Sequence, residues 1–294
     1  MTQFFELVLN GLSLGSIYAL IALGFVIVFK ATEVVNFAQG SLLVLGGYIT
    51  TQAHDHMPFV LALLVGVSAT AFTALVIERV FIHNARGGDV NALAILTIGI
   101  DILLITELTR RFGSNVLTIG DPWGNKLVHF AGVSLPQSRL AAIMVAFVLL
   151  AAFFLAFKFS NWGVAMRAGA EDGEAAALMG IRRGRVTATA WMVAGALAAV
   201  AVVFLTAFPS PGLDTGAREI ALRAFPAAIL GGLDSTAGAV VGGLAIGLAE
   251  SMTAGYSVTF LGGSLADVIP YLVMLVILLV RPSGIFGTRE LSRV

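Results

Sequence analysis

Residues 7–29 read LVLNGLSLGSIYALIALGFVIVF, a charge-free and largely apolar run that ends at Lys30. A helix needs ~20 apolar residues to cross the hydrocarbon core of a bilayer, and this run is long enough. It is too long for the apolar part of a signal peptide, and residues 1–6 contain no Lys or Arg. The run therefore predicts a membrane-spanning helix that remains in the mature protein.

Seven further apolar runs lie along the rest of the chain. They cover residues 34–51, 59–81, 90–109, 140–157, 186–208, 236–253 and 268–280. A shorter run, 220–233, contains Arg223 and Pro226 and would reach only ~21 Å as a helix. The runs predict an all-α fold, a polytopic transmembrane helical bundle of about eight spans with one or two broken half-helices. No loop could hold a separate soluble domain, so residues 1–294 are expected to form a single transmembrane domain.

The composition argues against most other classes of protein. Apolar residues make up 58% of the chain and charged residues 12%, which is about half the charged share of a soluble domain. Because so few charges could not cover a soluble surface, a cytosolic enzyme, a nucleic-acid-binding protein and a disordered protein are disfavoured. The 17 Lys and Arg residues balance 17 Asp and Glu residues, so no net field attracts a polyanion.

Motifs for catalysis and for cofactors are missing from the sequence. The chain has no Cys and 4 scattered His residues, which leaves little from which to build a metal site. It has no G-x-x-x-x-G-K-[ST] motif for ATP, no H-E-x-x-H and no Ser-His-Asp grouping. We therefore expect a protein that is not an enzyme and that carries no cofactor of its own.

The distribution of Lys and Arg indicates the orientation, because cytoplasmic loops retain these residues. With nine crossings and the N-terminus outside, 11 of the 17 basic residues lie inside and 6 lie outside, so we predict the N-terminus outside and the C-terminus in the cytoplasm. If 220–233 does not cross, the C-terminus moves outside and the basic residues divide almost equally. The loop 110–139 is rich in Gly and Pro, and it predicts a small extracytoplasmic cap of turns and short strands.

The loop 158–185 contains the clearest local signal on the inner side. Asp172 is suited to cap a short helix, Glu174 lies in the first turn of that helix, and Gly180 is suited to end it. A basic cluster follows directly. The apolar face of the helix carries Ala175, Leu178 and Met179. Such a helix either lies at the membrane interface or docks its apolar face on a cytoplasmic partner.

The sequence Glu174-Ala175-Ala176-x-x-x-Gly180 resembles the E-A-A-x-x-x-G core of ABC importer permeases, in which this loop docks on the ATPase. The I-x-L-P tail of the longer motif is absent, which separates the chain from maltose-type permeases. The resemblance implies that eight residues of the loop form an ATPase-coupling segment. They are Arg167, Asp172, Glu174, Ala175, Ala176, Leu178, Gly180 and Ile181.

Five stretches in order resemble the H-type (LivH-like) membrane subunit of branched-chain amino-acid ABC transporters. They are Gly11–Leu20, Asn36–Gly40, Met166–Ile181, Ala227–Gly243 and Arg281–Gly287, so the resemblance covers nearly the whole chain. It implies ATP-driven import of leucine, isoleucine and valine across the bacterial inner membrane. It also implies a LivM-like second permease subunit, two ATP-binding subunits that bind the ATP, and an extracytoplasmic solute-binding protein.

Two stretches break the apolar pattern with Gly and polar residues and are candidates for the solute path. The candidate residues are Asn36, Gln39 and Gly40 in the first stretch and Gly231, Gly232 and Ser235 in the second. Polar side chains and non-helical backbone are tolerated at membrane depth only where they face protein or water. For the two amides, hydrogen bonding between helices is the alternative. The resemblance implies two related halves, in which the two breaks would be counterparts.

Asp101 is the deepest carboxylate of the predicted spans. In a proton-coupled secondary transporter of a small polar solute it would be the proton site, and in an ATP-driven permease it would be structural. A permease for urea or short amides remains a further alternative. Small residues at GxxxG spacing predict close helix packing within the chain. These pairs are Gly11 and Gly15, Gly238 and Gly242, and Gly243 and Gly247.

Overall fold

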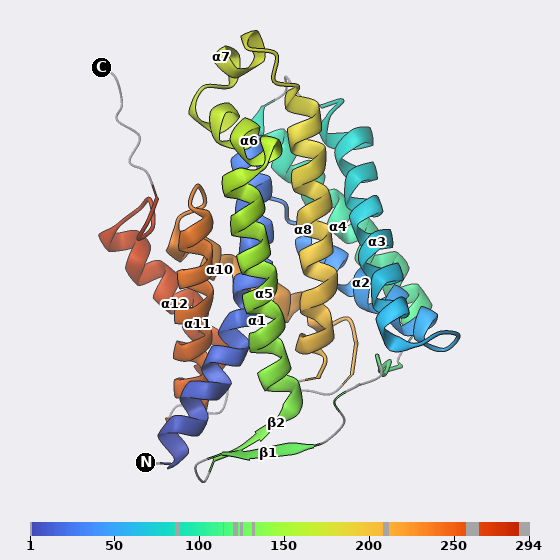
Figure 1. Ribbon diagram of the computed structural model, residues 1–294, viewed down its shortest axis with the longest axis vertical. Helices are drawn as coiled ribbons and strands as arrows, with labels where there is room; N and C mark the ends of the chain where they lie inside the picture. Colours follow the sequence, from blue (N-terminus) through green and yellow to red (C-terminus); the bar gives the residue numbers. More distant parts are fainter. Residues whose placement is uncertain are drawn as a thin grey trace.

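The computed structural model is a bundle of helices with one small β-hairpin among the described residues (Figure 1). It describes residues 2–85, 89–113, 115–119, 123, 126–130, 133–207, 212–256 and 265–287. The long helices are α1 (Thr2–Thr32), α3 (Phe59–Ile77), α4 (Val90–Phe112), α5 (Gln137–Phe159), α8 (Arg183–Leu205) and α11 (Thr236–Tyr256). A π-helical turn, η1 (Glu78–Ile82), continues α3.

The shorter elements connect or flank these long helices. They are α2 (Gln39–His54), α6 (Asn161–Glu171), α7 (Gly173–Leu178), α9 (Ala217–Leu222), α10 (Ala224–Gly231) and α12 (Leu265–Val280). The hairpin pairs β1 (Leu127–Phe130) with β2 (Val133–Pro136) in antiparallel fashion. The predicted all-α helical bundle is thereby confirmed.

Six helices among the described residues are long and apolar enough to cross a membrane: α1, α3 with η1, α4, α5, α8 and α11. Two more of the eight predicted spans, α2 and α12, contain 16 residues each and reach about 24 Å. The predicted start of the second span at residue 34 is wrong, because the chain around Asn36 is not helical and α2 begins at Gln39. The ninth, broken segment is the pair α9 and α10.

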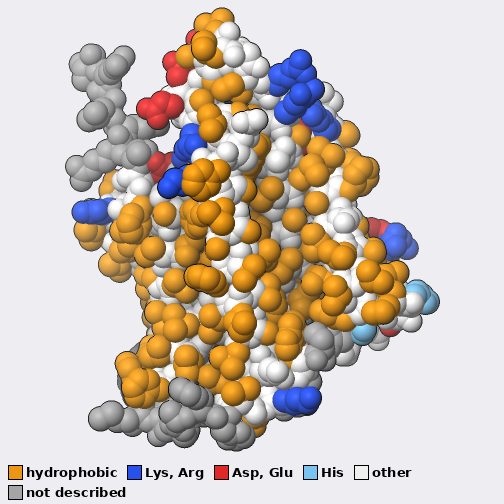
Figure 2. All heavy atoms as spheres, viewed as in Figure 1, with side chains coloured by type: hydrophobic (Ala, Val, Ile, Leu, Met, Phe, Trp, Pro, Cys, Tyr) orange, Lys and Arg blue, Asp and Glu red, His pale blue; other side chains and the backbone are white. Residues whose placement is uncertain are grey.

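Helix α1 lies at the centre of the bundle. A helix that is apolar on all sides must be enclosed by protein or exposed to lipid. In α1, 89% of the most apolar window is buried, against α5, α8, α10 and α11, whereas the corresponding share of α5 is 17%. Helix α5 turns large side chains such as Phe147 and Leu155 outward. Figure 2 shows apolar side chains over most of this face, as contact with lipid requires.

Glycines bring the backbones of α1 and α11 into direct contact. A Cβ built on Gly247 would overlap the backbone of Gly15, and one built on Gly243 would overlap that of Ala19. Gly238, on the same helix, likewise meets the backbone of α10. Small residues permit this close approach in membrane helices. The predicted packing of the GxxxG pairs within the chain is therefore confirmed for α11.

The two halves of the chain repeat one packing scheme. The first half runs through α1, α2, α3 and α4, and the second runs through α8, α9–α10, α11 and α12. Helix α1 packs along α11 while α8 packs along α3. In the same way, α2 contacts α3 and α4 while α10 contacts α11 and α12. Each half has its broken segment in second place, as expected for counterparts.

The bundle has two distinct ends (Figure 1). The α7 end carries α6, α7, the last turn of α1 and the start of α8, and the hairpin end carries β1, β2 and the start of α5. The chain enters α9 from Leu213, which pairs with Leu117 just beyond α4. It leaves α10 at Asp234, whose carbonyl accepts a hydrogen bond from Lys30 at the α7 end. The segment α9–α10 therefore traverses the bundle.

The hairpin confirms the short strands predicted for the loop 110–139, although the connection between the helices is shorter than that range. Helix α4 continues to Phe112 and α5 begins at Gln137. Several residues used in the sequence argument lie outside the described residues. They are Gly120, Pro122, Gly124 and Gly132 of the predicted cap, and Arg86, Arg289 and Arg293 of the predicted inner basic set.

Candidate functional site

The predicted coupling segment forms two short helices, α6 and α7. Helix α6 was not predicted, and its first turn is capped by Ser160, whose hydroxyl accepts a hydrogen bond from the Gly163 amide at 3.1 Å. Helix α7 has the predicted N-cap, because Asp172 Oδ1 accepts from the amides of Glu174 and Ala175 at 3.0 and 2.9 Å. The predicted end is also present, since Gly180 has a φ of +86° that suits glycine.

The apolar side chains of α7 divide into two groups. Ala176 is buried, and the Ile181 amide bonds to its carbonyl at 3.0 Å. Leu178 and Met179 project from the molecule with 88% and 85% of their surface exposed. A large apolar side chain that loses almost no surface on folding is available for contact with another molecule. Arg167 holds the base of the segment, because its guanidinium donates to the Phe157 carbonyl.

Asn36 and Gln39 lie in the middle of the bundle and are fully buried. Asn36 Nδ2 donates to Gln39 Oε1 at 3.2 Å, and Gln39 Nε2 donates to the carbonyl of Ala194 at 3.1 Å. Ala194 is the central residue of α8, so the break before α2 lies at mid-depth. In this conformation the Gln39 amide joins α2 to α8, as the alternative interpretation expects, whereas Asn36 bonds only to Gln39 and to the amide of Ala38.

Gly40 lies against α9. A Cβ built on Gly40 would come within 3.0 Å of Arg218 Cγ. Arg218 donates from Nε to Asp101 Oδ2 at 2.9 Å, and its Nη2 donates to the same oxygen. Asp101 is almost fully buried, so this ion pair ties α9 to α4 inside the bundle.

The sequence argument missed this partner, because Arg218 was counted only as a charge of an outer loop. A signal was available in the charged residues of the short apolar run 220–233 and its flank. The second arginine there, Arg223, bonds to Glu250 at 3.2 Å and to Asp267 at 2.8 Å. Tyr18 donates to the other oxygen of Glu250 at 2.8 Å. Arg223 thus connects the broken segment with α1, α11 and α12.

The second group of predicted path residues lies elsewhere, in the turn between α10 and α11 at the α7 end. Gly231 abuts the backbone of Gly238, and Gly232 has a φ of +103° beside Gly287. Ser235 caps α11, with its hydroxyl accepting from the Gly238 amide at 3.0 Å. These residues pack against α11 and the segment after α12, whereas Gly40 meets α9, which precedes them in the chain.

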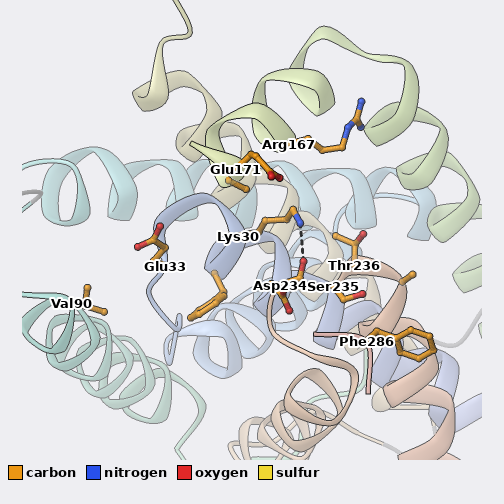
Figure 3. A pocket seen from close by; sticks show the side chains of 12 residues that line it. Lys30, Glu33, Val90, Arg167, Glu171, Asp234, Ser235, Thr236 and Phe286 are labelled. Carbon is orange, nitrogen blue, oxygen red and sulfur yellow. Dashed lines mark hydrogen bonds between the residues drawn. The ribbon is translucent and has the colours of Figure 1, made fainter. Parts of the chain in front are cut away.

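Ser235 and Arg167 both line a cavity of about 740 Å³ at the α7 end (Figure 3). Its wall combines α6 with the end of α1, the starts of α4 and α11, the turn between α10 and α11, and the segment after α12. The lining residues are Phe29, Lys30, Glu33, Val90, Arg167, Ala170, Glu171, Asp234, Ser235, Thr236, Ala237 and Phe286. Lys30 reaches across to the Asp234 carbonyl at 2.8 Å. The cavity is polar enough to hold water, and it touches the helix that supports α7.

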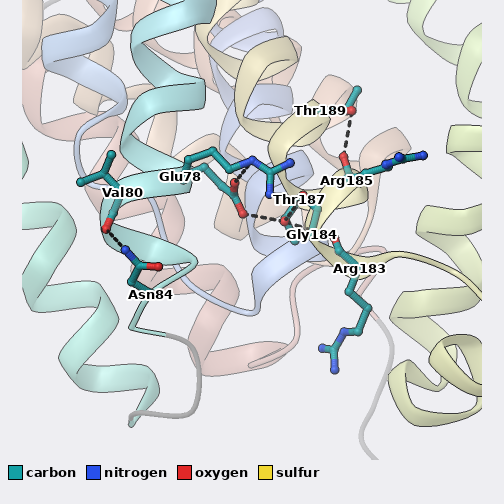
Figure 4. A network of polar contacts seen from close by, with 9 residues as sticks. Glu78, Val80, Asn84, Arg183, Gly184, Arg185, Thr187 and Thr189 are labelled. Atoms are coloured by element: carbon teal, nitrogen blue, oxygen red, sulfur yellow. Dashed lines mark hydrogen bonds and ion pairs between the residues drawn. The ribbon is translucent and has the colours of Figure 1, made fainter.

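A buried contact fixes the start of α8 against η1. Glu78, fully buried in η1, accepts a hydrogen bond from the Thr187 hydroxyl at 2.7 Å (Figure 4). The side chains of Arg183 and Arg185 point away from this contact. The arginines of the basic cluster are exposed, so the positive charge at this end faces outward.

Comparison with known proteins identifies the family. Residues 7–278 match the family described as the branched-chain amino acid transport system / permease component. The chain is 31% identical to the high-affinity branched-chain amino acid transport system permease protein LivH of Escherichia coli K12, over 99% of this chain and 98% of LivH. The chain belongs to this permease family. The permease is also 31% identical to BraD, the corresponding permease protein of Pseudomonas aeruginosa, with the same coverage.

A probable LivH permease of Methanocaldococcus jannaschii is 28% identical over 96% of this permease and 92% of its own length. The permease also shares its fold with PsaBC from Streptococcus pneumoniae in complex with Fab. That likeness has a TM-score of 0.52 at 14% identity and covers 96% of this chain and 93% of the other. With six apolar helices of spanning length among its described residues, the permease is a multi-pass membrane protein and a transport subunit of an ABC importer. Among the residues that the structure describes, no group of His, Asp and Glu could hold a metal ion.

Proposed function

We propose that this permease subunit imports leucine, isoleucine and valine across the bacterial inner membrane. In this proposal it works with a LivM-like permease subunit, two ATP-binding subunits and an extracytoplasmic solute-binding protein. ATP is bound and hydrolysed by the ATP-binding subunits, and this chain needs no cofactor. The α7 end faces the cytoplasm and the N-terminus lies outside. The names of the relatives support the solute, and the basic residues at the α7 end support the orientation.

The observation that carries the coupling role is the exposed apolar tip of α7. Asp172 caps the helix and Gly180 ends it, so the fold holds Leu178 and Met179 in a fixed, protruding position. Burying such side chains against a partner contributes about 1.5–3 kcal/mol each. The helix α6 connects this tip to the cavity through Arg167 and Glu171, so a push on α7 reaches the cavity wall directly.

The first test changes the tip of α7. The double substitution Leu178→Asp and Met179→Asp is expected to lower ATP-driven leucine uptake at least tenfold and to remove the ATP-binding subunits from the purified complex. The physical reason is that two buried apolar contacts become two buried charges. Uptake is measured in proteoliposomes, with unlabelled leucine or urea as competitor to define the solute class.

The control is Leu127→Asp, which alters an exposed leucine of the hairpin at the opposite end. It should leave both uptake and subunit composition unchanged. Normal uptake by the double variant, with its ATP-binding subunits still attached, would show that α7 does not couple.

We further propose that the solute path runs past the break around Asn36 and Gly40 and leaves through the cavity at Ser235. The support is that both stretches interrupt the helical backbone and that Ser235 lines a polar cavity. Asp101 is the less favoured proton site, because Arg218 already pairs with it. Passage past Asn36 requires motion, since its amide is fully buried and bonded in this conformation.

The absence of native cysteine allows a direct test of this path. In the assembled transporter, Ser235→Cys should react with a small polar thiol reagent in every state. Asn36→Cys should be protected at rest and should react when ATP and leucine are supplied. The control is Phe147→Cys on the lipid-facing side of α5, which should remain inert because thiols in lipid do not ionise. A protected Asn36→Cys in every state would move the path elsewhere.

A further inference from the structure

Helix α2 begins in the middle of the bundle and runs away from the α7 end. Its first residue, Gln39, bonds to the carbonyl of Ala194 at the centre of α8 at 3.1 Å. Further along α2, Tyr48 packs on Phe112, the last residue of α4, with ring centroids 5.1 Å apart. Helix α4 starts at the α7 end, where Val90 lines the cavity. Because the free amides of a helix point out of its N-terminus, those of α2 point from mid-depth towards the α7 end.

Two of these amides have no acceptor. The Ala38 amide bonds to Asn36 Oδ1 at 3.1 Å, and the Gln39 amide bonds to the Asn36 carbonyl at 3.2 Å. Among the described residues, the amides of Gly40 and Ser41 make no hydrogen bond, and no side chain caps the helix. Both residues are buried. Buried backbone amides are almost always paired, so this helix end lacks an acceptor that its surroundings should supply.

A third donor without an acceptor faces this helix end from α8. Trp191 is fully buried, and its indole Nε1 has no hydrogen-bond partner among the described residues. Trp191 lies one turn before Ala194 on the same face of α8, and therefore nearer the α7 end than the start of α2. Its side chain belongs to the same buried cluster as Ala38 and Leu42, which flank the two free amides in the chain. The indole thus lies on the side towards which the amides of α2 point.

Three buried donors without an acceptor are suited to a carboxylate. A carboxylate only accepts hydrogen bonds and can accept several at once. The N-terminus of a helix favours a negative charge, and the first turn of α2 contains no Asp or Glu that could supply one. Broken membrane helices bind the anionic groups of their solutes in this way. A water molecule would need acceptors for its own hydrogens, whereas the cluster around Trp191 consists of apolar side chains.

We propose that the amides of Gly40 and Ser41 and the indole N–H of Trp191 bind the carboxylate of the imported amino acid at mid-membrane. This inference rests on the proposed function, which supplies an amino-acid solute and a path past the break. In this conformation the bonded side chains of Asn36 and Gln39 fill the break, so the carboxylate enters when the bond from Gln39 to α8 opens. A solute without a carboxylate leaves the three donors unpaired, which makes the site selective.

The test measures solute binding to the complete transporter without its solute-binding protein, so that any selectivity belongs to the permease subunits. Binding of radiolabelled leucine and of leucinamide, which has an amide in place of the carboxylate, is compared without nucleotide and with a non-hydrolysable ATP analogue. The unsubstituted complex should bind leucine at least tenfold more tightly than leucinamide. Trp191→Phe should lower this ratio at least threefold. The matched control is Trp162→Phe, because the Trp162 indole already donates to the Val186 carbonyl at 3.2 Å, and it should leave the ratio unchanged.

Ser41→Cys tests the same site without altering Trp191. In the nucleotide state in which this thiol reacts, an anionic thiol reagent should react faster than a cationic one, because the helix N-terminus attracts anions. Leucine should slow the reaction and leucinamide should not. A thiol that is inert in both states, or that reacts equally with both reagents, would place the carboxylate elsewhere.

The outcomes separate this inference from the proposed function. If the unsubstituted complex imports leucine but binds leucine and leucinamide equally, or binds no leucine in either nucleotide state, the inference fails and the proposed function stands. The inference also fails if Trp191→Phe weakens the binding of both solutes by the same factor, because the indole is then only structural. A complex that imports urea and not leucine would overturn the proposed function, and the inference with it.

Discussion

Replacement of Gly247 by leucine is expected to abolish the accumulation of folded protein. A Cβ at this position would overlap the backbone nitrogen and Cα of Gly15, and backbone atoms cannot rotate out of the way as a side chain can. The overlap is therefore relieved only by separating α1 from α11, which form the most extensive helix contact of the bundle. Overpacking a core lowers the stability of a protein by about 1–3 kcal/mol, occasionally more. We expect the loss for this substitution to lie at or above the upper end of that range.

Thermal unfolding of the detergent-solubilised protein measures the effect. Gly99→Leu is the matched control, because it introduces the same side chain into a membrane helix at a position with nothing within 4 Å. We expect the control variant to unfold within a few degrees of the unsubstituted protein and the Gly247 variant to be recovered only in aggregates. Equal stability of the two variants would mean that α1 and α11 do not touch in this way.

Replacement of Asp101 by alanine is expected to have the second largest effect. The substitution leaves the Arg218 guanidinium next to a buried, apolar site without its counter-ion. Removing one partner of a buried ion pair destabilises a protein by about 3–5 kcal/mol, whereas replacing both by apolar residues is often neutral. The double substitution Asp101→Leu and Arg218→Leu should therefore recover most of the lost stability in the isolated chain.

A surface ion pair of the same helix provides the control for this prediction. Glu107 bonds to Arg110 and Arg111 at the end of α4, where all three side chains are exposed. Such pairs contribute about 0–1 kcal/mol, so Glu107→Ala should lower the stability of the protein only slightly.

Uptake by Asp101→Asn should continue with ATP and should resist a proton uncoupler. A loss of uptake on adding the uncoupler, with ATP held constant, would instead favour a proton site at Asp101.

The sequence predicted those elements that depend on neighbouring residues. The apolar run 7–29 forms most of α1. Helix α7 begins after Asp172 and ends before Gly180 as expected, because an N-cap and a positive-φ glycine act within one turn of the chain. The small residues of α11 correctly predicted close packing with other helices of the chain. A GxxxG spacing indicates that two backbones can approach closely, although it does not identify the partner helix. The contact with Gly15 was therefore known only from the structure.

Elements that depend on distant residues could not be predicted in the same way. The pairing of Asp101 with Arg218 joins residues far apart in the chain, and neither local sequence states the other's position. The different depths of Gly40 and Gly231 in the bundle could not be predicted for the same reason. Two similar breaks in an apolar pattern carry no information about the depth of one relative to the other. The fate of the Asn36 amide was also undecided, since an amide at membrane depth can serve either a neighbouring helix or a passing solute.

The glycine contacts of α11 have a mechanical consequence. Helices that meet backbone to backbone have no side chains between them to rearrange, so α1, α10 and α11 behave as one rigid unit. Rearrangement during a transport cycle then falls to the helices with few neighbours, which are α4, α6, α7 and α12. In the proposed coupling role, a displacement of α7 transmitted through α6 would change the width of the cavity, because α6 shares the cavity wall with α1 and α11, while the centre of the bundle would stay still.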